Sequence, residues 1–137
     1  MPRAVVTDLN SGEDVNLRTL IPAERPILFW FYSPYCGYCA REAPSLEQFA
    51  RDHQSDLTVI GLGTQSDYDE ARDFAARYGI TFRMFWDSGF DSWDGYVVWG
   101  TPTSILISRG GTTMKRWPGV MSDQGRAEAV RLARDQG

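Results

Sequence analysis

The chain contains two cysteines, Cys36 and Cys39, which lie three positions apart in the run SPYCGYCAREAPSL. An apolar run at residues 27–33 predicts a buried strand before them, and helical spacing of apolar residues predicts a helix over 37–52. At the N-terminus of that helix, Cys36 meets unpaired backbone N–H groups and the positive end of the helix dipole, which favour a thiolate. Residues three apart on a helix have Cβ atoms ~5–6 Å apart, close enough for a disulfide after a small adjustment. The spacing therefore predicts an attacking thiol and a resolving thiol on one helix.

Other interpretations of the cysteine pair are weaker. A structural zinc site needs four ligands, and His53 is the only histidine, so we expect no metal and no cofactor. A disulfide framework in a secreted domain would need more cysteines, spread along the chain. Two ordinary buried cysteines remain the structural alternative, because free cysteine is often buried.

The rest of the chain supplies elements that can position this pair. The strands are expected over residues 4–9, 14–17, 27–33, 57–63, 81–86, 104–107 and 112–117. The helices are expected over residues 37–52, 69–78 and 122–135, with Gly79 after the second and Ser122 or Asp123 as the cap of the third. Early strands alternate with helices, and the chain ends in a hairpin and a helix. This order predicts an α/β fold with a central mixed sheet flanked by helices.

Composition limits the remaining classes. The 137 residues, 42% of them apolar, fit one domain over residues 1–137 with a core of its own. A net charge of −4 and the lack of a Lys/Arg cluster argue against nucleic acid as a partner. The longest apolar run, residues 27–32, is too short to cross a bilayer. The start of the chain does not resemble a signal peptide, so we expect either a cytoplasmic protein or one whose leader or anchor lies outside this sequence.

Four segments, taken in order, resemble the thioredoxin superfamily, and within it the TlpA/ResA-like thiol–disulfide oxidoreductases. They are DVNLRTL, FWFYSPYCGYCAREAPSL, VIGLGTQSDYDEARDFAARYGITF and GTPTSILISRGG, and together they span nearly the whole chain. The resemblance implies a thioredoxin fold with an N-terminal β-hairpin and an extra helix before the cis-proline strand. It also implies a monomeric reductant of protein disulfides, served by an upstream redox partner and located outside the cytoplasm.

The resemblance also implies roles for individual residues. Cys36 matches the exposed nucleophile and Cys39 the resolving cysteine. Pro102 matches the cis-proline that packs against the active site, so we expect a cis bond between Thr101 and Pro102. Thr101 would present its backbone to an incoming substrate chain.

Two positions, Trp30 and Tyr35, depart from thioredoxin itself. Trp30 stands six residues before Cys36, where thioredoxin has a buried aspartate. Glu42 matches the active-site glutamate of ResA-like members, and we expect it to govern the proton on the resolving thiol, with a pKa raised by partial burial. The alternative is a carboxylate that only stabilises the helix dipole. Tyr35 replaces the usual tryptophan before the first cysteine and keeps an aromatic platform for substrate.

Several functional alternatives stay open. Cys-Gly-Tyr-Cys together with Thr-Pro resembles the DsbC-type isomerases, so a disulfide oxidase or isomerase is one alternative. A redox-inert binding module that uses the aromatic segment 85–99 is another, although core packing is the preferred interpretation of that segment. A peroxiredoxin is disfavoured, because its loop calls for a threonine at the position of Ser33 and does not require a second cysteine three residues on.

Overall fold

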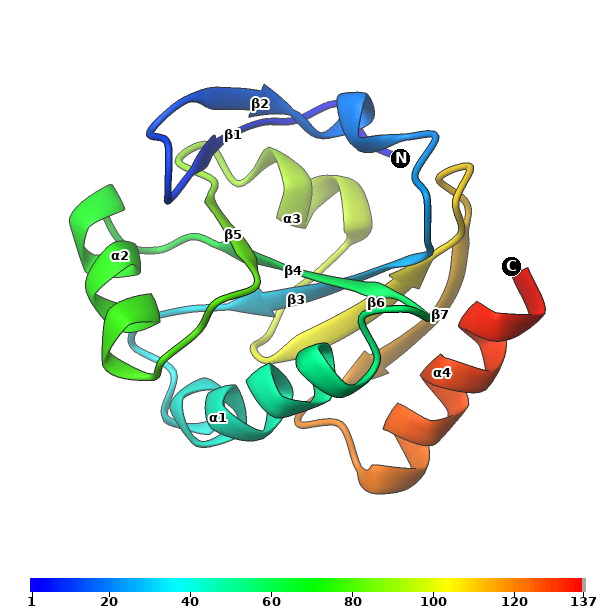
Figure 1. Cartoon of the computed structure of the whole chain (residues 1–137). Helices are drawn as coiled ribbons and strands as arrows, with labels where there is room; N and C mark the ends of the chain where they lie inside the picture. The colour runs from blue at the N-terminus through cyan, green and yellow to red at the C-terminus, as the bar shows by residue number, and fades with distance from the viewer. Residues whose placement is uncertain (137) are drawn as a thin grey trace.

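A computed structural model describes residues 1–136 and shows one seven-stranded mixed sheet with the strand order β2-β1-β5-β4-β3-β6-β7 (Figure 1). The strands are β1 (Val5–Asp8), β2 (Asp14–Asn16), β3 (Ile27–Tyr32), β4 (Thr58–Gly63), β5 (Arg83–Trp86), β6 (Thr103–Ile107) and β7 (Thr113–Pro118). Strands β3, β4 and β5 run parallel to one another, whereas β6 runs antiparallel to β3. The sheet is therefore mixed, as the sequence predicts.

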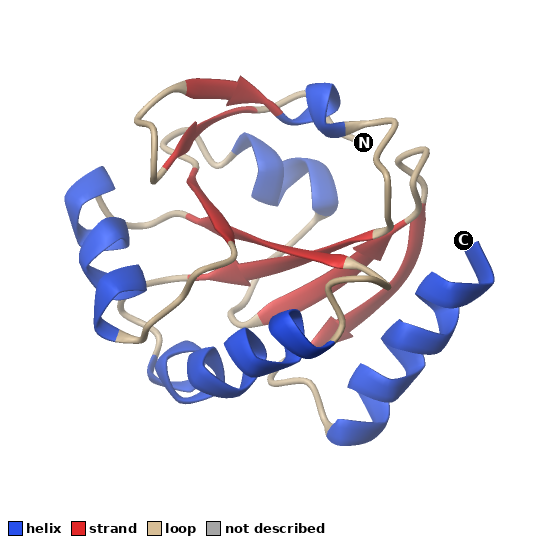
Figure 2. Cartoon of the chain, in the orientation of Figure 1, coloured by secondary structure: helices blue, strands red, loops and turns tan. Residues whose placement is uncertain are grey.

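Helices cover both faces of this sheet (Figure 2). They are the short 3₁₀ helix η1 (Leu17–Leu20), α1 (Gly37–Asp52), α2 (Tyr68–Arg77), α3 (Asp91–Tyr96) and α4 (Asp123–Gln136). One core cluster joins the sheet to buried residues of α1, α2 and α4, and a second joins its other face to α3 and the N-terminal segment. In Figure 1, α1 and α4 accordingly lie on the opposite side of the central strands from α3.

Strand β3 is buried on both faces, and this burial positions the cysteines. Leu28, Trp30 and Tyr32 pack in the cluster under α1, while Phe29 and Phe31 pack in the opposite cluster. Each of these five side chains is 0% exposed. Because successive side chains of a strand point to opposite faces, this continuous apolar run requires a central position in the sheet. The carboxyl end of this central strand leads directly into the turn that starts α1.

The structure confirms the thioredoxin-like α/β fold, including the N-terminal hairpin and the helix α2 that follows β4. Helix α1 spans the residues that the sequence predicts. The Asp67 carboxylate caps α2 by accepting a bond from the Glu70 N–H at 2.8 Å, and the Ser122 hydroxyl caps α4 through the Gly125 N–H at 3.0 Å. Among the described residues, no helix combines the length and hydrophobicity that a membrane span requires.

Two elements lack a sequence signal, η1 and α3. Helix α3 has six residues and follows Phe90, whose backbone is left-handed and whose side chain makes no cap bond. Its capping carboxylate is instead that of Asp87, which lies three residues before the cap position. This carboxylate accepts a bond from the Ser92 N–H at 2.8 Å. A helix this short and without a local cap gives no recognisable periodicity.

Helix α3 also determines which aromatic side chains of the segment 85–99 are buried. Phe85, Trp93 and Tyr96 are buried, at 0%, 4% and 6% exposure, so the core-packing interpretation is correct for them. Trp99 is 90% exposed, and for this residue the core-packing interpretation is wrong. The chain after α3 follows the surface, with Val97 and Trp99 exposed and Val98 between them buried in the second core cluster.

Candidate active site

Cys36 is the N-cap residue of α1. Its backbone is extended, with φ −93° and ψ 111°, and its sulfur accepts a bond from the Cys39 N–H at 3.2 Å. A tight turn delivers it there, because the Cys36 N–H donates to the Ser33 carbonyl at 3.0 Å. The sulfur therefore lies at the positive end of a sixteen-residue helix, as the sequence predicts.

The two thiols have opposite environments. Cys36 is partly exposed; burial opposes its ionisation, but hydrogen bonds from Cys39, Thr101 and the Tyr38 backbone outweigh this, so its pKa lies below that of an ordinary thiol. Cys39 is 0% exposed. Burial, followed by hydrogen bonding with Cys36, raises the pKa of Cys39, and bonds from Ser33 and Thr101 offset this only in part. Near neutral pH the pair therefore offers one reactive and one unreactive sulfur.

The Thr101–Pro102 bond is cis, as expected from the sequence. The next residue, Thr103, begins β6 and pairs with Phe31 near the end of β3. This pairing brings residues 101 and 102 to the same end of the sheet as the cysteines. The Thr101 side chain hydrogen bonds with the thiols and lowers the pKa of Cys36.

Glu42 lies on the second turn of α1 and is 2% exposed. One of its carboxylate oxygens accepts a bond from the Trp30 indole N–H at 2.9 Å. The other accepts the Met121 N–H at 3.0 Å and faces a guanidinium nitrogen of Arg126 at 3.4 Å. Glu42 is thus buried, next to the turn of α1 that holds Cys39, and it already has three donors.

Tyr35 precedes Cys36 and is 66% exposed. Its hydroxyl donates to the carboxylate of Glu70 at the start of α2, and this bond raises the pKa of the phenol. The ring is therefore held toward α2 with a free surface. Of the six residues selected from the sequence, Cys36, Cys39 and Thr101 converge at the sulfurs, Pro102 follows Thr101, and Glu42 and Tyr35 flank this group.

Sequence reasoning missed the partners of Glu42. Arg126 and the backbone of Met121 come from the chain segment around the start of α4, 84 and 79 positions away. Nothing in the local pattern links that segment to α1. The one available signal was Trp30, an indole N–H in an otherwise apolar strand, because a buried indole N–H usually has an acceptor.

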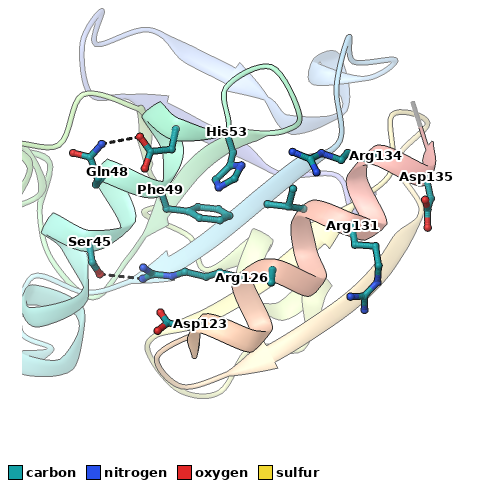
Figure 3. A pocket seen from close by; sticks show the side chains of 12 residues that line it. Ser45, Gln48, Phe49, His53, Asp123, Arg126, Arg131, Arg134 and Asp135 are labelled. Carbon is teal, nitrogen blue, oxygen red and sulfur yellow. Dashed lines mark hydrogen bonds between the residues drawn. The ribbon is translucent and has the colours of Figure 1, made fainter.

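A cavity of about 780 Å³ lies between α1 and α4, away from the cysteines (Figure 3). Phe49 and Val130 form part of its lining, and Arg126 reaches across it to the Ser45 hydroxyl at 3.1 Å. Neither cysteine lines this cavity, so the redox chemistry belongs to the opposite end of α1. Among residues 1–136, no three His, Cys, Asp or Glu side chains gather closely enough to hold a metal ion.

Known proteins resemble this chain over most of its length. It is 29% identical to the thiol-disulfide oxidoreductase ResA of Halalkalibacterium halodurans over 133 residues, which is 96% of this chain and 74% of ResA. It is 30% identical to the soluble secreted antigen MPT53 of Mycobacterium tuberculosis over 89 residues, and this match spans 65% of the chain but only 51% of the antigen.

Solved structures show the same arrangement. The 1.1 Å crystal structure of a secreted Mycobacterium tuberculosis disulfide oxidoreductase homologous to E. coli DsbE superposes with a TM-score of 0.78 and 26% identity. That superposition covers 95% of this chain and 96% of the other. The model of the AhpC/TSA family matches residues 1–116 and so includes both cysteines and Pro102. With its fold, its cysteine pair and its relatives in agreement, the chain belongs to the AhpC/TSA family of thioredoxin-like proteins.

Proposed function

We propose that this chain is a thiol–disulfide oxidoreductase that reduces disulfides in protein substrates. The observation that carries the proposal is the contrast between its two thiols. Cys36 is partly exposed with a lowered pKa, and Cys39 is buried with a raised one. A pair with these properties attacks in a fixed order, because only a thiolate is nucleophilic.

In the reaction, the Cys36 thiolate attacks one sulfur of a substrate disulfide and displaces the other as a thiolate, which takes up a proton. Cys39 then loses its proton and attacks the Cys36 sulfur. The substrate leaves as a dithiol, and the two electrons it gained are balanced by formation of the Cys36–Cys39 disulfide. An upstream reductant must reduce that disulfide before the next turnover, so a redox partner is part of the proposal.

The reductive direction is supported by the nature of the donors around Cys36. They are backbone N–H groups, a thiol and a hydroxyl, all uncharged. Strong oxidants of this chemistry depend on an unusually stable thiolate, which makes the reduced form favourable. Moderate stabilisation by neutral donors favours a more reducing potential. Within the AhpC/TSA family, a resolving cysteine three residues after the nucleophile favours disulfide exchange over peroxide reduction.

Glu42 is proposed as the proton acceptor for Cys39. The two residues are three positions apart on one face of α1, and the deeply buried thiol needs a base before it can attack. Thr101 and Pro102 are proposed to bind the substrate backbone, and Tyr35 to form one wall of that site.

We also propose that the protein is a monomer that works outside the cytoplasm. The similar MPT53 antigen is described as secreted, and so is the mycobacterial disulfide oxidoreductase whose structure superposes on this chain. A reporter that is active only outside the cytoplasm, fused to the gene with its native upstream sequence, tests the location. Light scattering after gel filtration tests the oligomeric state.

Reduction of insulin by dithiothreitol, followed as turbidity, tests the activity. We expect the wild-type chain to accelerate precipitation and Cys36→Ser to abolish the acceleration. A redox titration of the Cys36–Cys39 pair against glutathione then fixes the direction. A reduction potential above that of the glutathione couple would indicate an oxidase or isomerase rather than a reductant. A wild-type chain that is inactive in the insulin assay would indicate a redox-inert binding module.

A further inference from the structure

The segment that leads into the cis-proline carries a large exposed apolar surface. This segment, residues 97–100, is called the Trp99 segment below. Trp99 is 90% exposed and Val97 is 52% exposed. Tryptophan is buried to a large extent on average, so an indole that is almost wholly exposed on the surface of a domain is unusual. Exposed apolar surface of this kind commonly marks an interaction site.

The Trp99 segment is held in place by hydrogen bonds along its length. The Arg116 guanidinium donates to the carbonyls of Tyr96 and Val97. The Val98 N–H donates to the Trp93 carbonyl at 2.8 Å. At the other end, the Thr103 hydroxyl donates to the Gly100 carbonyl at 2.7 Å. The indole therefore projects from a fixed backbone rather than from a loose loop.

The same segment stores backbone strain. Val97 has φ 56° and ψ 52°, which is the left-handed region. A β-branched residue is a genuine outlier there, because its side chain clashes with the backbone in this region. Strain and an exposed tryptophan are both unfavourable for the free protein, and they occur within three residues of each other. Their persistence points to a use for this surface.

The segment also borders a cleft that extends to Thr101 and Pro102. The cleft has a volume of about 310 Å³, and Trp99, Pro102, Arg116 and Pro118 are among the residues that line it. Thr101 lies on the same cleft, and its side chain is near enough to the Cys36 thiol to lower the pKa of that thiol. This volume is at the small end of binding pockets, which hold roughly 300–1,000 Å³, and suits one large side chain.

We propose that the Trp99 segment and this cleft bind a bulky apolar side chain of the substrate, two positions from the substrate cysteine. The proposal rests on the proposed function. A substrate that pairs its backbone with Thr101 lies extended, and side chains two residues apart in an extended chain point to the same side. A residue two positions from the reacting cysteine can then reach the cleft that Trp99 lines together with Thr101. The preferred substrates are unfolded or extended segments with an aromatic or large aliphatic residue at that spacing.

The test uses two synthetic peptides, each with one cysteine joined to glutathione as a mixed disulfide. One peptide carries phenylalanine two positions on either side of the cysteine, and the other carries serine there. The fully reduced protein converts each to peptide thiol and glutathione while forming the Cys36–Cys39 disulfide, and chromatography of the released glutathione over time gives the second-order rate constant of this single turnover. Burial of one aromatic side chain supports a preference of about tenfold for the phenylalanine peptide.

Three variants separate this site from general effects. Trp99→Ala should bring the ratio of the two second-order rate constants below about twofold, and Trp99→Phe should restore most of it. Because the ratio is taken within one protein sample, loss of folded protein cancels. Val5→Ala is the control, since Val5 is an apolar residue 54% exposed on β1, outside the cleft. It should keep the wild-type ratio.

The outcomes distinguish this proposal from the one on which it rests. Reduction of both peptides at equal rates by the wild type, or a preference that survives Trp99→Ala, would overturn the specificity site and leave the oxidoreductase in place. Failure of the wild type to reduce either peptide would overturn the oxidoreductase itself and the specificity site with it.

Discussion

Replacement of Glu42 by glutamine tests how the buried carboxylate beside the active site is used. The carboxylate accepts from Trp30, from Met121 and from Arg126, with one oxygen facing the first and the other facing the last two. Glutamine keeps the shape but has one acceptor oxygen, so its NH₂ group must face a donor on one side. The substitution loses a hydrogen bond to a charged group and leaves a buried donor unsatisfied.

Together with the loss of the counter-ion of Arg126, whose side chain is 14% exposed, we expect a loss of about 3 kcal/mol in the free energy of unfolding. For a domain of this size that corresponds to roughly 10 °C in Tm. Urea denaturation of the reduced protein at pH 7 measures the change. Glu128→Gln, at a more exposed carboxylate that pairs with Lys115, is the control and should change stability little. A loss of less than about 1 kcal/mol in the free energy of unfolding of Glu42→Gln would refute the stabilising role of these hydrogen bonds to Glu42.

Kinetics separate the positional role of Glu42 from its proposed role as a base. If Glu42 accepts the Cys39 proton, mixed disulfides at Cys36 should resolve about tenfold more slowly in Glu42→Gln, and the pH–rate profile should move to higher pH. Rapid acid quenching of the reaction with a disulfide peptide, at a series of pH values, measures the lifetime. A profile that overlays the wild type, in a variant that has lost stability as expected, would restrict Glu42 to holding α1 in place.

Four further predictions concern the two thiols, two tyrosine hydroxyls and one carboxylate. Alkylation of single-cysteine variants should show Cys36 reacting faster than Cys39 at neutral pH, with a rate that rises through a pKa below that of an ordinary thiol; a faster Cys39 would reverse their roles. The Tyr32 hydroxyl is buried without a partner among the described residues, so Tyr32→Phe should leave stability unchanged or raise it by about 1 kcal/mol. Tyr68→Phe, which removes a 3.0 Å bond to a backbone carbonyl, should instead lower it by a similar amount in the same denaturation assay. Glu47 bonds the backbone and side chain of the turn before β5, and its pKa is lowered, so its contribution is present above the unfolded value of 4.5 and is lost as pH falls through the folded pKa. The loss of stability on acidification below about pH 4.5 should therefore be smaller in Glu47→Gln, by about the contribution of one carboxylate.

The local elements could be predicted because their signals are local. The apolar run that forms β3 and the helical spacing of α1 each lie within a short window, and these two elements alone place Cys36 at a helix N-terminus. The fold class follows from the order of such windows. Helix α3 could not be predicted in this way, since its cap comes from Asp87, and its role is to pack Trp93 and Tyr96 against the sheet.

The sequence by itself determined which atoms react and in what order. Two cysteines three positions apart after a buried strand require a strand–turn–helix, and the helix end favours a thiolate at Cys36 by its own electrostatics. Tertiary structure decided what surrounds those sulfurs. Glu42 is buried among Trp30, Met121 and Arg126, and Trp99 is exposed while Trp93 is buried, because such outcomes depend on contacts between segments up to 84 positions apart. The local sequence pattern indicates secondary-structure propensity and the spacing of apolar residues. Burial and hydrogen-bond partners, in contrast, are properties of the packed chain.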